Sequence, residues 1–249
     1  MVILKSREEI EQLRVSNQIV AEVLECLKTL IQPGITTQDL DRYAEEMTLK
    51  KGAKPAFKGY MGYPSSLCVS VNSEVVHGIP SDRVLKDGDI VSLDFGSYYQ
   101  GYYGDSAMTI PVGNVSGNAK RLIDVTNEAL YKGIAEARTK NRLGDISAAV
   151  QNHVERAGFS VVRDFVGHGI GRKLHEEPQI PNFGIQGRGI ALKAGMVFAI
   201  EPMVNEGTYH VKVMKDGWTV VTLDGKLSAH FEHTVAITED GPDILSKHA

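Results

Sequence analysis

The stretch LDFGSYYQGYYGDSAM, residues 93–108, contains two aspartates, Asp94 and Asp105, with mainly glycine and tyrosine between them. β-Prone residues precede the pair in DIVSL and follow it in AMTI, which predicts a strand, a tight turn and a second strand. A turn centred on Tyr99–Gln100 would place the two aspartates directly opposite each other on one face of the hairpin. Like charges so close are destabilising unless the side chains reach water, share a proton or hold a cation. The hairpin alone favours a pair of aspartates exposed to water. Only the rest of the sequence can show whether the pair instead shares a proton or holds a cation.

The order of the predicted elements occurs twice along the chain. A first helix opens with the capping box SREE at Ser6 and ends before QPG, and a second helix covers 37–52. Strand signals then dominate 67–110. A helix near 118–138 and another over DISAAVQNHVERAG, with Asp145 as its expected cap, are followed by strands to the end. This order indicates a duplicated half.

Short sequence matches in the same order support the duplication. LKDGDIVSLDFG resembles LKAGMVFAIEPM, and this match places Asp94 on Glu201. GDSAMTI resembles FEHTVAI, which places Asp105 on Glu232, and HGIP resembles HEEP further along the chain. The acids of the first hairpin therefore have acidic counterparts in a second, longer hairpin. A pseudo-twofold arrangement of the two parts would bring four carboxylates together.

Four buried carboxylates would repel one another severely, whereas two divalent cations would neutralise them. His168, in the glycine-flanked segment VGHGIG, is the histidine expected to complete such a site. Histidine with several carboxylates favours manganese, iron, cobalt or zinc over calcium, and the affinity order of these metals leaves the choice open. Two close metals can activate a bridging hydroxide and polarise a carbonyl, so the pattern predicts a hydrolase.

Composition limits the possible partners and the cellular location of the protein. The chain has 249 residues, of which 42% are hydrophobic, and a formal charge of -4 without a basic stripe, so nucleic acid is not an expected partner. Two cysteines give neither a disulfide framework nor a cysteine zinc site, which fits a reducing compartment. The N-terminus turns charged after three apolar residues, unlike a signal peptide, and no apolar run approaches the roughly 20 residues of a membrane span. We therefore expect a cytoplasmic protein. We also expect a monomer, because no exposed apolar helix face stands out in the sequence as an interface.

Five segments resemble the signature blocks of type I methionine aminopeptidases of peptidase family M24. They are HGIPSDRVLKDGDIVSLDFG, GYYGDSAMT, VGHGIGRKLHEEPQIPNFG, GMVFAIEPM and AHFEHTVAIT, and the resemblance extends over nearly the whole chain. It implies the α/β pita-bread fold, with antiparallel sheets covered by helices and internal pseudo-twofold symmetry. It also implies a single catalytic domain over 1–249, made of two halves, about 1–112 and 113–249.

The resemblance assigns a role to each candidate site residue. The implied ligands of two divalent ions are Asp94, Asp105, His168, Glu201 and Glu232. Asp105 and Glu232 match the bridging ligands, and Glu201 matches the position linked to proton transfer. His77 and His175 match two histidines that bind the substrate and the developing tetrahedral centre. Positions of the methionine side-chain pocket match Tyr60, Tyr63, Cys68 and Trp218, with Leu174 beside His175.

The implied reaction is removal of the initiator methionine from nascent chains with a free amine, when the second residue is small. Contact with the ribosome is possible, although no zinc-finger segment for it is present in the sequence. His233 should face away from Glu232, because neighbouring strand residues alternate. His230 shares the face of Glu232, and both a supporting role beside the metal ligands and a surface hydrogen bond remain open for it.

Three other classes of protein with this scaffold are alternatives to this function. Prolidases and Xaa-Pro aminopeptidases share the scaffold but usually carry a sizeable N-terminal domain, whereas the first predicted helix here starts at Ser6. Creatinase-like relatives lack the acidic pairs. A catalytically inactive binding protein of this fold would typically lose ligands and gain basic insertions, and the sequence shows neither. Bound divalent metal and activity with manganese or cobalt would separate the enzyme from the binding protein.

Overall fold

The computed structural model describes residues 2–247. Its helical elements are α1 (Arg7–Leu30), α2 (Thr37–Lys50), the short 3-10 turn η1 (Tyr60–Gly62), α3 (Gly117–Ala135) and α4 (Leu143–Arg156). Strands of the first part are β1 (Lys54–Pro55), β2 (Leu67–Val71), β3 (Glu74–Val76), β4 (Ile90–Tyr99) and β5 (Tyr102–Pro111). Strands of the second part are β6 (Ser160–Val161), β7 (Gly167–Gly169), β8 (Glu176–Ile180), β9 (Val197–Ile200), β10 (Met203–Asn205), β11 (Val211–Val213), β12 (Val220–Thr222), β13 (Ser228–His230), β14 (Glu232–Thr238) and β15 (Gly241–Ile244).

Helix boundaries follow local capping. At the start of α1, Ser6 accepts a hydrogen bond from the backbone of Glu9, and the Glu9 carboxylate accepts one from the backbone of Ser6, as the sequence predicts. At α4 the expected cap is wrong. Asp145 lies in the first turn and accepts from the backbone of Arg142 at 2.7 Å, so the helix begins at Leu143. An acid at the cap and an acid three residues later give similar sequence patterns, which explains the error.

The large sheet joins strands from both parts of the chain. Its order is β1-β4-β5-β14-β9-β7-β8, with β2 paired to β4 and β15 paired to β14, and its paired strands are antiparallel. The seam between the two parts is the β5–β14 pair, where Glu232 lies opposite Ala107 and His233 opposite Ser106. The two hairpins that carry the sequence matches therefore meet in the middle of one sheet.

The register of the β4–β5 hairpin differs from the expected one. Tyr99 pairs with Tyr102 and Asp94 pairs with Ala107, so the turn is Gln100–Gly101. Both turn residues have positive φ, 47° and 93°, as tight two-residue hairpin turns require, and glycine adopts this conformation without steric cost. Asp94 and Asp105 are consequently diagonal neighbours on one face rather than a directly opposed pair.

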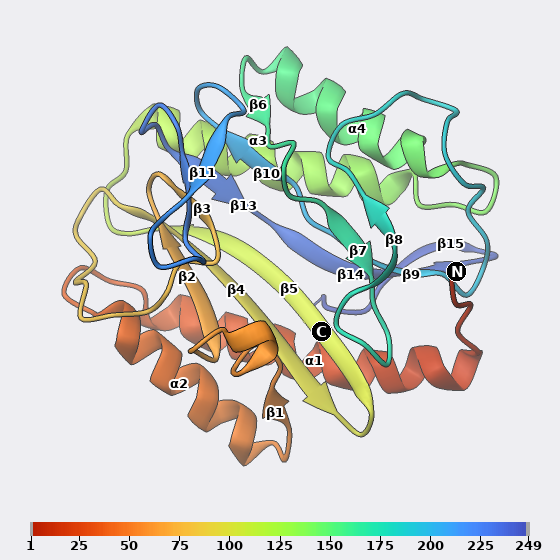
Figure 1. Ribbon diagram of the computed structural model, residues 1–249, viewed down its shortest axis with the longest axis horizontal. Helices are drawn as coiled ribbons and strands as arrows, with labels where there is room; N and C mark the ends of the chain where they lie inside the picture. Colours follow the sequence, from red (N-terminus) through yellow and green to blue (C-terminus); the bar gives the residue numbers. More distant parts are fainter. Residues whose placement is uncertain (1, 248–249) are drawn as a thin grey trace.

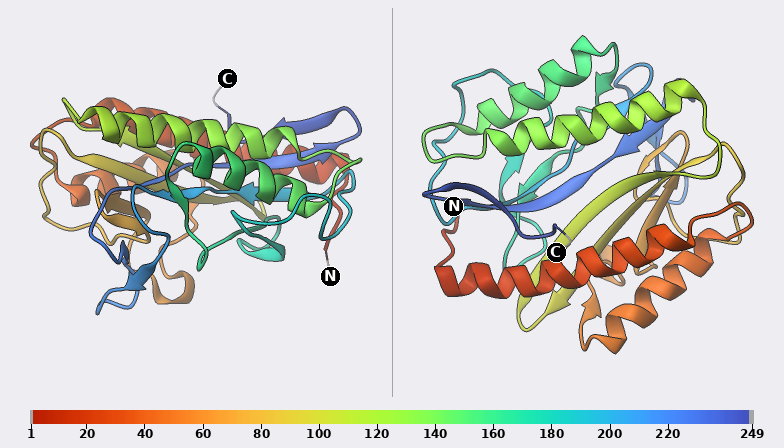
Figure 2. Two further views of the ribbon diagram at one scale, coloured as in Figure 1. Left: turned by 90° about the horizontal axis from the view of Figure 1, so that it is seen from above. Right: turned by 180° about the vertical axis from the view of Figure 1, so that it is seen from behind.

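Helices cover one face of the large sheet, and β11 and β12 lie on the other side (Figures 1 and 2). The small sheet β13-β10-β6 packs against α3 and α4. In the rear view of Figure 2, α1 and α3 run in front of the sheet, with α2 beside α1 and α4 beside α3. The additional residues of the second hairpin include β11 and β12, which pair with each other, and β12 also pairs with β3 in a separate three-stranded sheet. No helix within residues 2–247 has the length and apolar character to cross a membrane.

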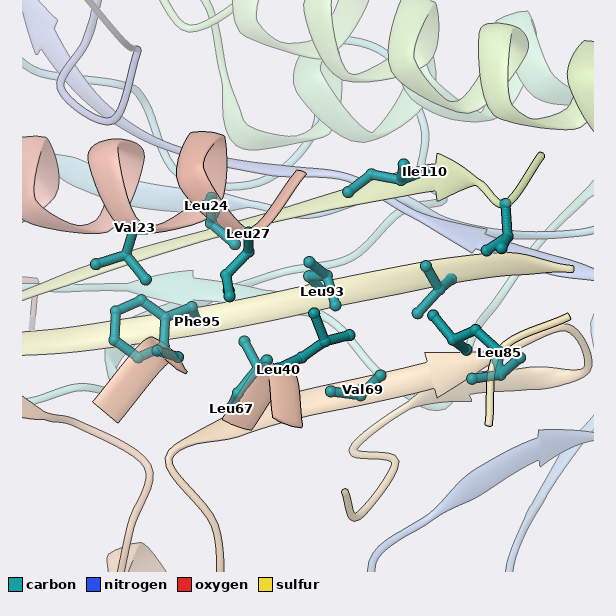
Figure 3. Close-up of a cluster of buried hydrophobic side chains, with 14 of the residues drawn as sticks. Val23, Leu24, Leu27, Leu40, Leu67, Val69, Leu85, Leu93, Phe95 and Ile110 are labelled. Carbon is teal, nitrogen blue, oxygen red and sulfur yellow. The ribbon is translucent and has the colours of Figure 1, made fainter. Parts of the chain in front are cut away.

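A hydrophobic cluster between α1, α2 and the sheet fixes the position of β4 (Figure 3). Figure 3 labels Val23, Leu24, Leu27, Leu40, Leu67, Val69, Leu85, Leu93, Phe95 and Ile110. Burying a side chain of this size fully contributes about 1.5–3 kcal/mol. Leu93 and Phe95 point into this cluster, and side chains alternate along a strand, so Asp94 points to the opposite, concave face.

Candidate metal centre

Neighbouring strands of the large sheet supply the predicted metal ligands. Asp94 lies in β4, Asp105 in β5 and Glu232 at the start of β14, while Glu201 directly follows β9 and His168 is the central residue of β7. These strands stand next to one another in the sheet order β4-β5-β14-β9-β7. The fold thus brings together acids from both parts of the chain, as the internal matches predict.

The ligand atoms of this cluster lie within reach of a shared ion. One donor atom each of Asp105, His168 and Glu232 lies within 4.8 Å of the others. The His168 Nε2 atom is 3.9 Å from Oδ2 of Asp105 and 3.6 Å from Oε1 of Glu201. Nδ1 of His168 donates a hydrogen bond of 2.9 Å to the carbonyl of Gly169, which leaves the Nε2 lone pair facing the acids. That tautomer is the one a metal ligand needs.

Burial perturbs the titration of the whole cluster. It raises the pKa of Asp94 to about 7, and burial together with repulsion between the acids raises the pKa values of Asp105 and Glu232 well above their ordinary values. The pKa of Glu201 is raised for the same two reasons. Burial lowers the pKa of His168 to about 3, which keeps its imidazole neutral. The protein alone thus stabilises these acids poorly as anions.

Several carboxylate oxygens of the cluster also lack hydrogen bonds. Within residues 2–247, Oδ1 of Asp94, Oδ1 of Asp105 and Oε1 of Glu232 are buried and have no hydrogen-bond partner. A buried polar atom without a partner costs free energy unless another group satisfies it. Carboxylate oxygens beside a neutral imidazole suit divalent transition metals, so the residues present fit such ions.

The candidate site residues line one cavity of about 190 Å³ on the concave face. Its lining includes all twelve residues that the sequence predicts: Tyr60, Tyr63, Cys68, His77, Asp94, Asp105, His168, Leu174, His175, Glu201, Trp218 and Glu232. We call this space the site cavity. Phe57 and Met61 also line it and were not predicted. Their closeness to Tyr60 in the segment AFKGYMGY is the only sequence signal that could have indicated them.

One wall of the site cavity is apolar. The rings of Tyr63 and Trp218 meet edge to face with centroids 5.1 Å apart, and the Tyr63 hydroxyl donates to the carbonyl of Gly78 at 2.9 Å. Cys68 pairs with Asp94 across strands β2 and β4, and burial raises the pKa of its thiol, which therefore stays uncharged. This wall can hold an apolar side chain directly beside the acids.

Two further histidines flank the acids. His77 has a positive φ of 60°, which is uncommon outside glycine, and its ring meets those of Phe165 and Trp218 edge to face. Burial lowers the pKa of His77 to about 4 and also lowers that of His175. The rings of His175 and His168 lie 4.3 Å apart between centroids. Both flanking imidazoles are therefore neutral near pH 7 and able to donate one hydrogen bond each.

The structure shows where the side chains of His230 and His233 lie. His230 is buried, and its Nε2 atom lies 3.7 Å from Oε2 of Glu201, so the surface interpretation is wrong. His233 faces away from the cavity, as predicted, and its ring bonds the hydroxyls of Ser246 and Tyr131. His233 thus supports the packing behind the sheet, whereas His230 lies beside a predicted ligand.

Comparisons with known proteins agree with the geometry. The sequence model of metallopeptidase family M24 matches residues 11–239. A methionine aminopeptidase of Clostridium perfringens is 58% identical over 246 residues, which are 99% of each chain. The methionine aminopeptidase 1 of Bacillus subtilis is 57% identical over 247 residues, 99% of this chain and 100% of that relative.

Solved structures resemble the fold over its full length. The crystal structure of a methionine aminopeptidase from Thermotoga maritima matches with a TM-score of 0.98 and 51% identity, covering 100% of both chains. A prolidase from Pyrococcus horikoshii matches with a TM-score of 0.81 but only 24% identity, and this chain covers 65% of it, so that likeness concerns the fold alone. The expected pita-bread fold is confirmed. Sequence and structure together place the chain in metallopeptidase family M24, among its methionine aminopeptidases.

Proposed function

We propose that this protein is a metal-dependent aminopeptidase that removes the initiator methionine from nascent proteins and peptides when the second residue is small. The observation that carries the proposal is one cavity with two adjoining parts. One part holds the buried acids Asp105 and Glu232, the half-buried acids Asp94 and Glu201, and a neutral His168. The other part is a small apolar wall. The first part suits hydrolysis, and the second suits an unbranched apolar side chain such as methionine.

The proposed cofactor is a pair of divalent ions held by Asp94, Asp105, His168, Glu201 and Glu232. Cobalt, manganese, iron and zinc all suit this set of donors. When bound, such ions lower the pKa of water and polarise a carbonyl group, and they attract the free amine of the substrate. Because an acetylated amine cannot bind in this way, only free N-termini are expected to react.

Glu201 is the proposed general base. Its carboxylate lies at the edge of the cluster, with one oxygen 3.6 Å from Nε2 of His168 and the other 3.7 Å from Nε2 of His230. In this role it accepts the proton of the attacking water and returns it to the leaving amine. His77 and His175 donate hydrogen bonds from neutral imidazoles to the scissile carbonyl and to the backbone of the second residue.

The apolar wall accounts for the proposed specificity. Tyr63, Cys68, Leu174 and Trp218 leave little room beside the acids, since the whole site cavity measures only about 190 Å³. A methionine side chain fills such a space and brings its own amine and carbonyl to the acids. Larger aromatic or charged residues would leave the carbonyl misplaced, which reduces turnover sharply.

Several finer statements belong to the same proposal. We propose that the chain is one catalytic domain, active as a monomer in the cytoplasm. Its two free cysteines support a reducing compartment. Nascent chains are the proposed partners, and the proposed place of contact with them is the ribosome. A catalytically inactive binding role finds less support, because every predicted ligand position is filled and lies in one cavity.

A cleavage panel tests the function. Purified protein with added manganese or cobalt should release methionine from Met-Ala-Ser and leave its N-acetylated form intact. Dipeptides with proline at the second position serve as the comparison for prolidase activity. Equal rates on Met-Ala-Ser and on such dipeptides would assign the protein to the prolidases instead. Failure to cleave any peptide, together with no bound metal, would favour the inactive binding protein.

A further inference from the structure

Tyr60 makes a polar contact that a pocket wall does not need. Its hydroxyl lies 2.7 Å from Nδ1 of His175, and the two rings are tilted with centroids 5.2 Å apart. Within residues 2–247, this is the one hydrogen bond that the Tyr60 hydroxyl makes. The contact joins the short turn η1 to a histidine that also packs against His168.

The backbone around Tyr60 holds the hydroxyl in place. Gly59, Met61 and Gly62 have positive φ values of 83°, 49° and 92°, so the chain folds tightly around the tyrosine. The amide of Tyr63 donates to the carbonyl of Tyr60 at 2.9 Å, and the amide of Gly59 donates to the carbonyl of Tyr63 at 2.8 Å. The turn is therefore closed by its own hydrogen bonds, and the ring of Tyr60 projects from it into the site cavity.

The direction of the Tyr60–His175 hydrogen bond follows from the state of both groups. Near pH 7 an ordinary phenol keeps its proton and an ordinary imidazole is mostly neutral. A neutral imidazole carries one N–H and one acceptor nitrogen. The phenol proton has no other acceptor among the described residues, and an imidazole nitrogen accepts it well. Nδ1 of His175 is then the acceptor, and the imidazole proton resides on Nε2.

We propose that Tyr60 is a positioning residue for His175, whose hydroxyl fixes the tautomer that presents an Nε2–H donor to the substrate. This inference rests on the proposed function, in which His175 donates to the substrate. With the other tautomer, Nε2 would present a lone pair to an oxygen that gains negative charge, and the contact would be repulsive. One phenol thus serves both as a wall for the methionine side chain and as the group that sets the proton of a catalytic histidine.

The variant Tyr60→Phe separates these two roles, because it keeps the ring and removes only the hydroxyl. With Met-Ala-Ser and added manganese, kcat should fall about 10- to 100-fold, as for other groups that orient catalytic side chains, while KM stays nearly constant. Tyr43→Phe is the matched control, since Tyr43 lies on α2 and does not line the site cavity. It removes the same atom and should leave both constants unchanged.

The tautomer itself can be measured without activity. In protein labelled with ¹⁵N-histidine and freed of metal, the ring nitrogen shifts of His175, assigned with His175→Gln, should show the proton on Nε2. In Tyr60→Phe these shifts should move toward a mixture of tautomers. A wild-type proton on Nδ1 would overturn the proposal even if the variant did not fold. An unchanged tautomer in Tyr60→Phe, or an unchanged kcat, would overturn it as well.

These outcomes differ from a failure of the proposed function. If His175→Gln retained full activity on Met-Ala-Ser, the role of His175 would be wrong, whatever its tautomer. If the wild-type protein cleaved no peptide, the aminopeptidase proposal would fail, while the nitrogen shifts would still report the Tyr60–His175 hydrogen bond. The spectroscopic and kinetic measurements therefore test separate statements.

Discussion

Asp94 shows how strand geometry positions a residue that is proposed as a metal ligand. Its neighbours Leu93 and Phe95 are fully buried against the helices, so alternation forces Asp94 to the concave face. There, one of its oxygens is buried without a hydrogen-bond partner, as are oxygens of Asp105 and Glu232. An acid in this setting is stabilised by a cation and by little else in the described structure.

Replacing one acid by its amide should therefore remove both metal and activity. For Asp94→Asn and Glu232→Gln we expect kcat to fall by more than about 100-fold, since even groups that only orient ligands cost up to that factor. Elemental analysis of the purified variants should show less bound metal than the wild type. Glu25→Gln, on the exposed side of α1, is the matched control and should behave as wild type. Full activity in either ligand variant would show that the acids serve another purpose.

His77 should affect turnover without affecting metal content. It lines the site cavity but is not part of the acid cluster, and its neutral imidazole is proposed to donate to the scissile carbonyl. Loss of one such donor costs about 10²- to 10³-fold in kcat, which is the expected effect of His77→Ala. The control is His153→Ala, because His153 lies on α4 and pairs with Glu128. A His77→Ala protein that had lost its metal would make His77 a ligand and contradict the assignment.

Individual residues differ in how far the sequence could predict them. The pairing of Asp94 with Glu201, and of Asp105 with Glu232, followed from internal matches, because a duplicated fold repeats its strand positions. The proposed roles of His77 and His175 came from the family resemblance. Phe57 and Met61 were missed, because apolar lining is decided by tertiary packing and leaves no periodic signal. The sequence also leaves the environment of His230 open, because strand alternation indicates the face of the sheet on which a side chain lies but not how deeply it is buried.

Among the elements, the β4–β5 hairpin is the one whose turn position the local sequence pattern predicts wrongly. The segment SYYQGYYG has tyrosine pairs on both sides, so hydrophobic pattern alone allows more than one turn centre. The deciding feature is Gly101, which adopts a φ of 93° at the second turn position. Glycine there is the sequence signal of a tight hairpin turn, and this signal indicates the observed register. The additional residues of the second hairpin were recognised, but their pairing with β3 depends on long-range contacts.

The hairpin turn gives a prediction about stability. Gly101→Ala should lower the free energy of unfolding by about 1 kcal/mol, because a side chain disfavours the left-handed conformation that this position requires. Gly117→Ala is the control, since Gly117 opens α3 and an added Cβ would meet no atom within 4 Å. Alanine at that helical position should be neutral or slightly stabilising. Urea unfolding measures both, and equal stabilities of the two variants would contradict the turn assignment.

At the scale of the whole molecule, the two parts meet at the β5–β14 seam, and the acid cluster spans that seam. Asp94 and Asp105 come from one part, and His168, Glu201 and Glu232 from the other. Ions bound there would join the parts, and the hydrophobic clusters on the far side hold each helix pair against its own strands. The proposed ligands therefore come together only where the two parts meet, because neither part carries all of them.

Metal removal should consequently destabilise the entire domain. An ion that binds only the folded state adds about 2.7 kcal/mol at a concentration 100 times its Kd. For a chain of this size, that corresponds to a rise in Tm of about 5–10 °C. Calorimetry of chelator-treated and manganese-loaded protein should show this difference.

In Asp105→Asn the rise in Tm on adding manganese should be smaller than in the wild type, because a proposed ligand is lost. Its metal-free form should be at least as stable as metal-free wild type, since one source of repulsion among the buried acids is gone. Glu25→Gln, whose charge lies outside the cluster on the surface of α1, should show the full wild-type rise. Equal rises in wild type and Asp105→Asn would mean that manganese stabilises the protein from another location, and the acids at the seam would then need a different explanation.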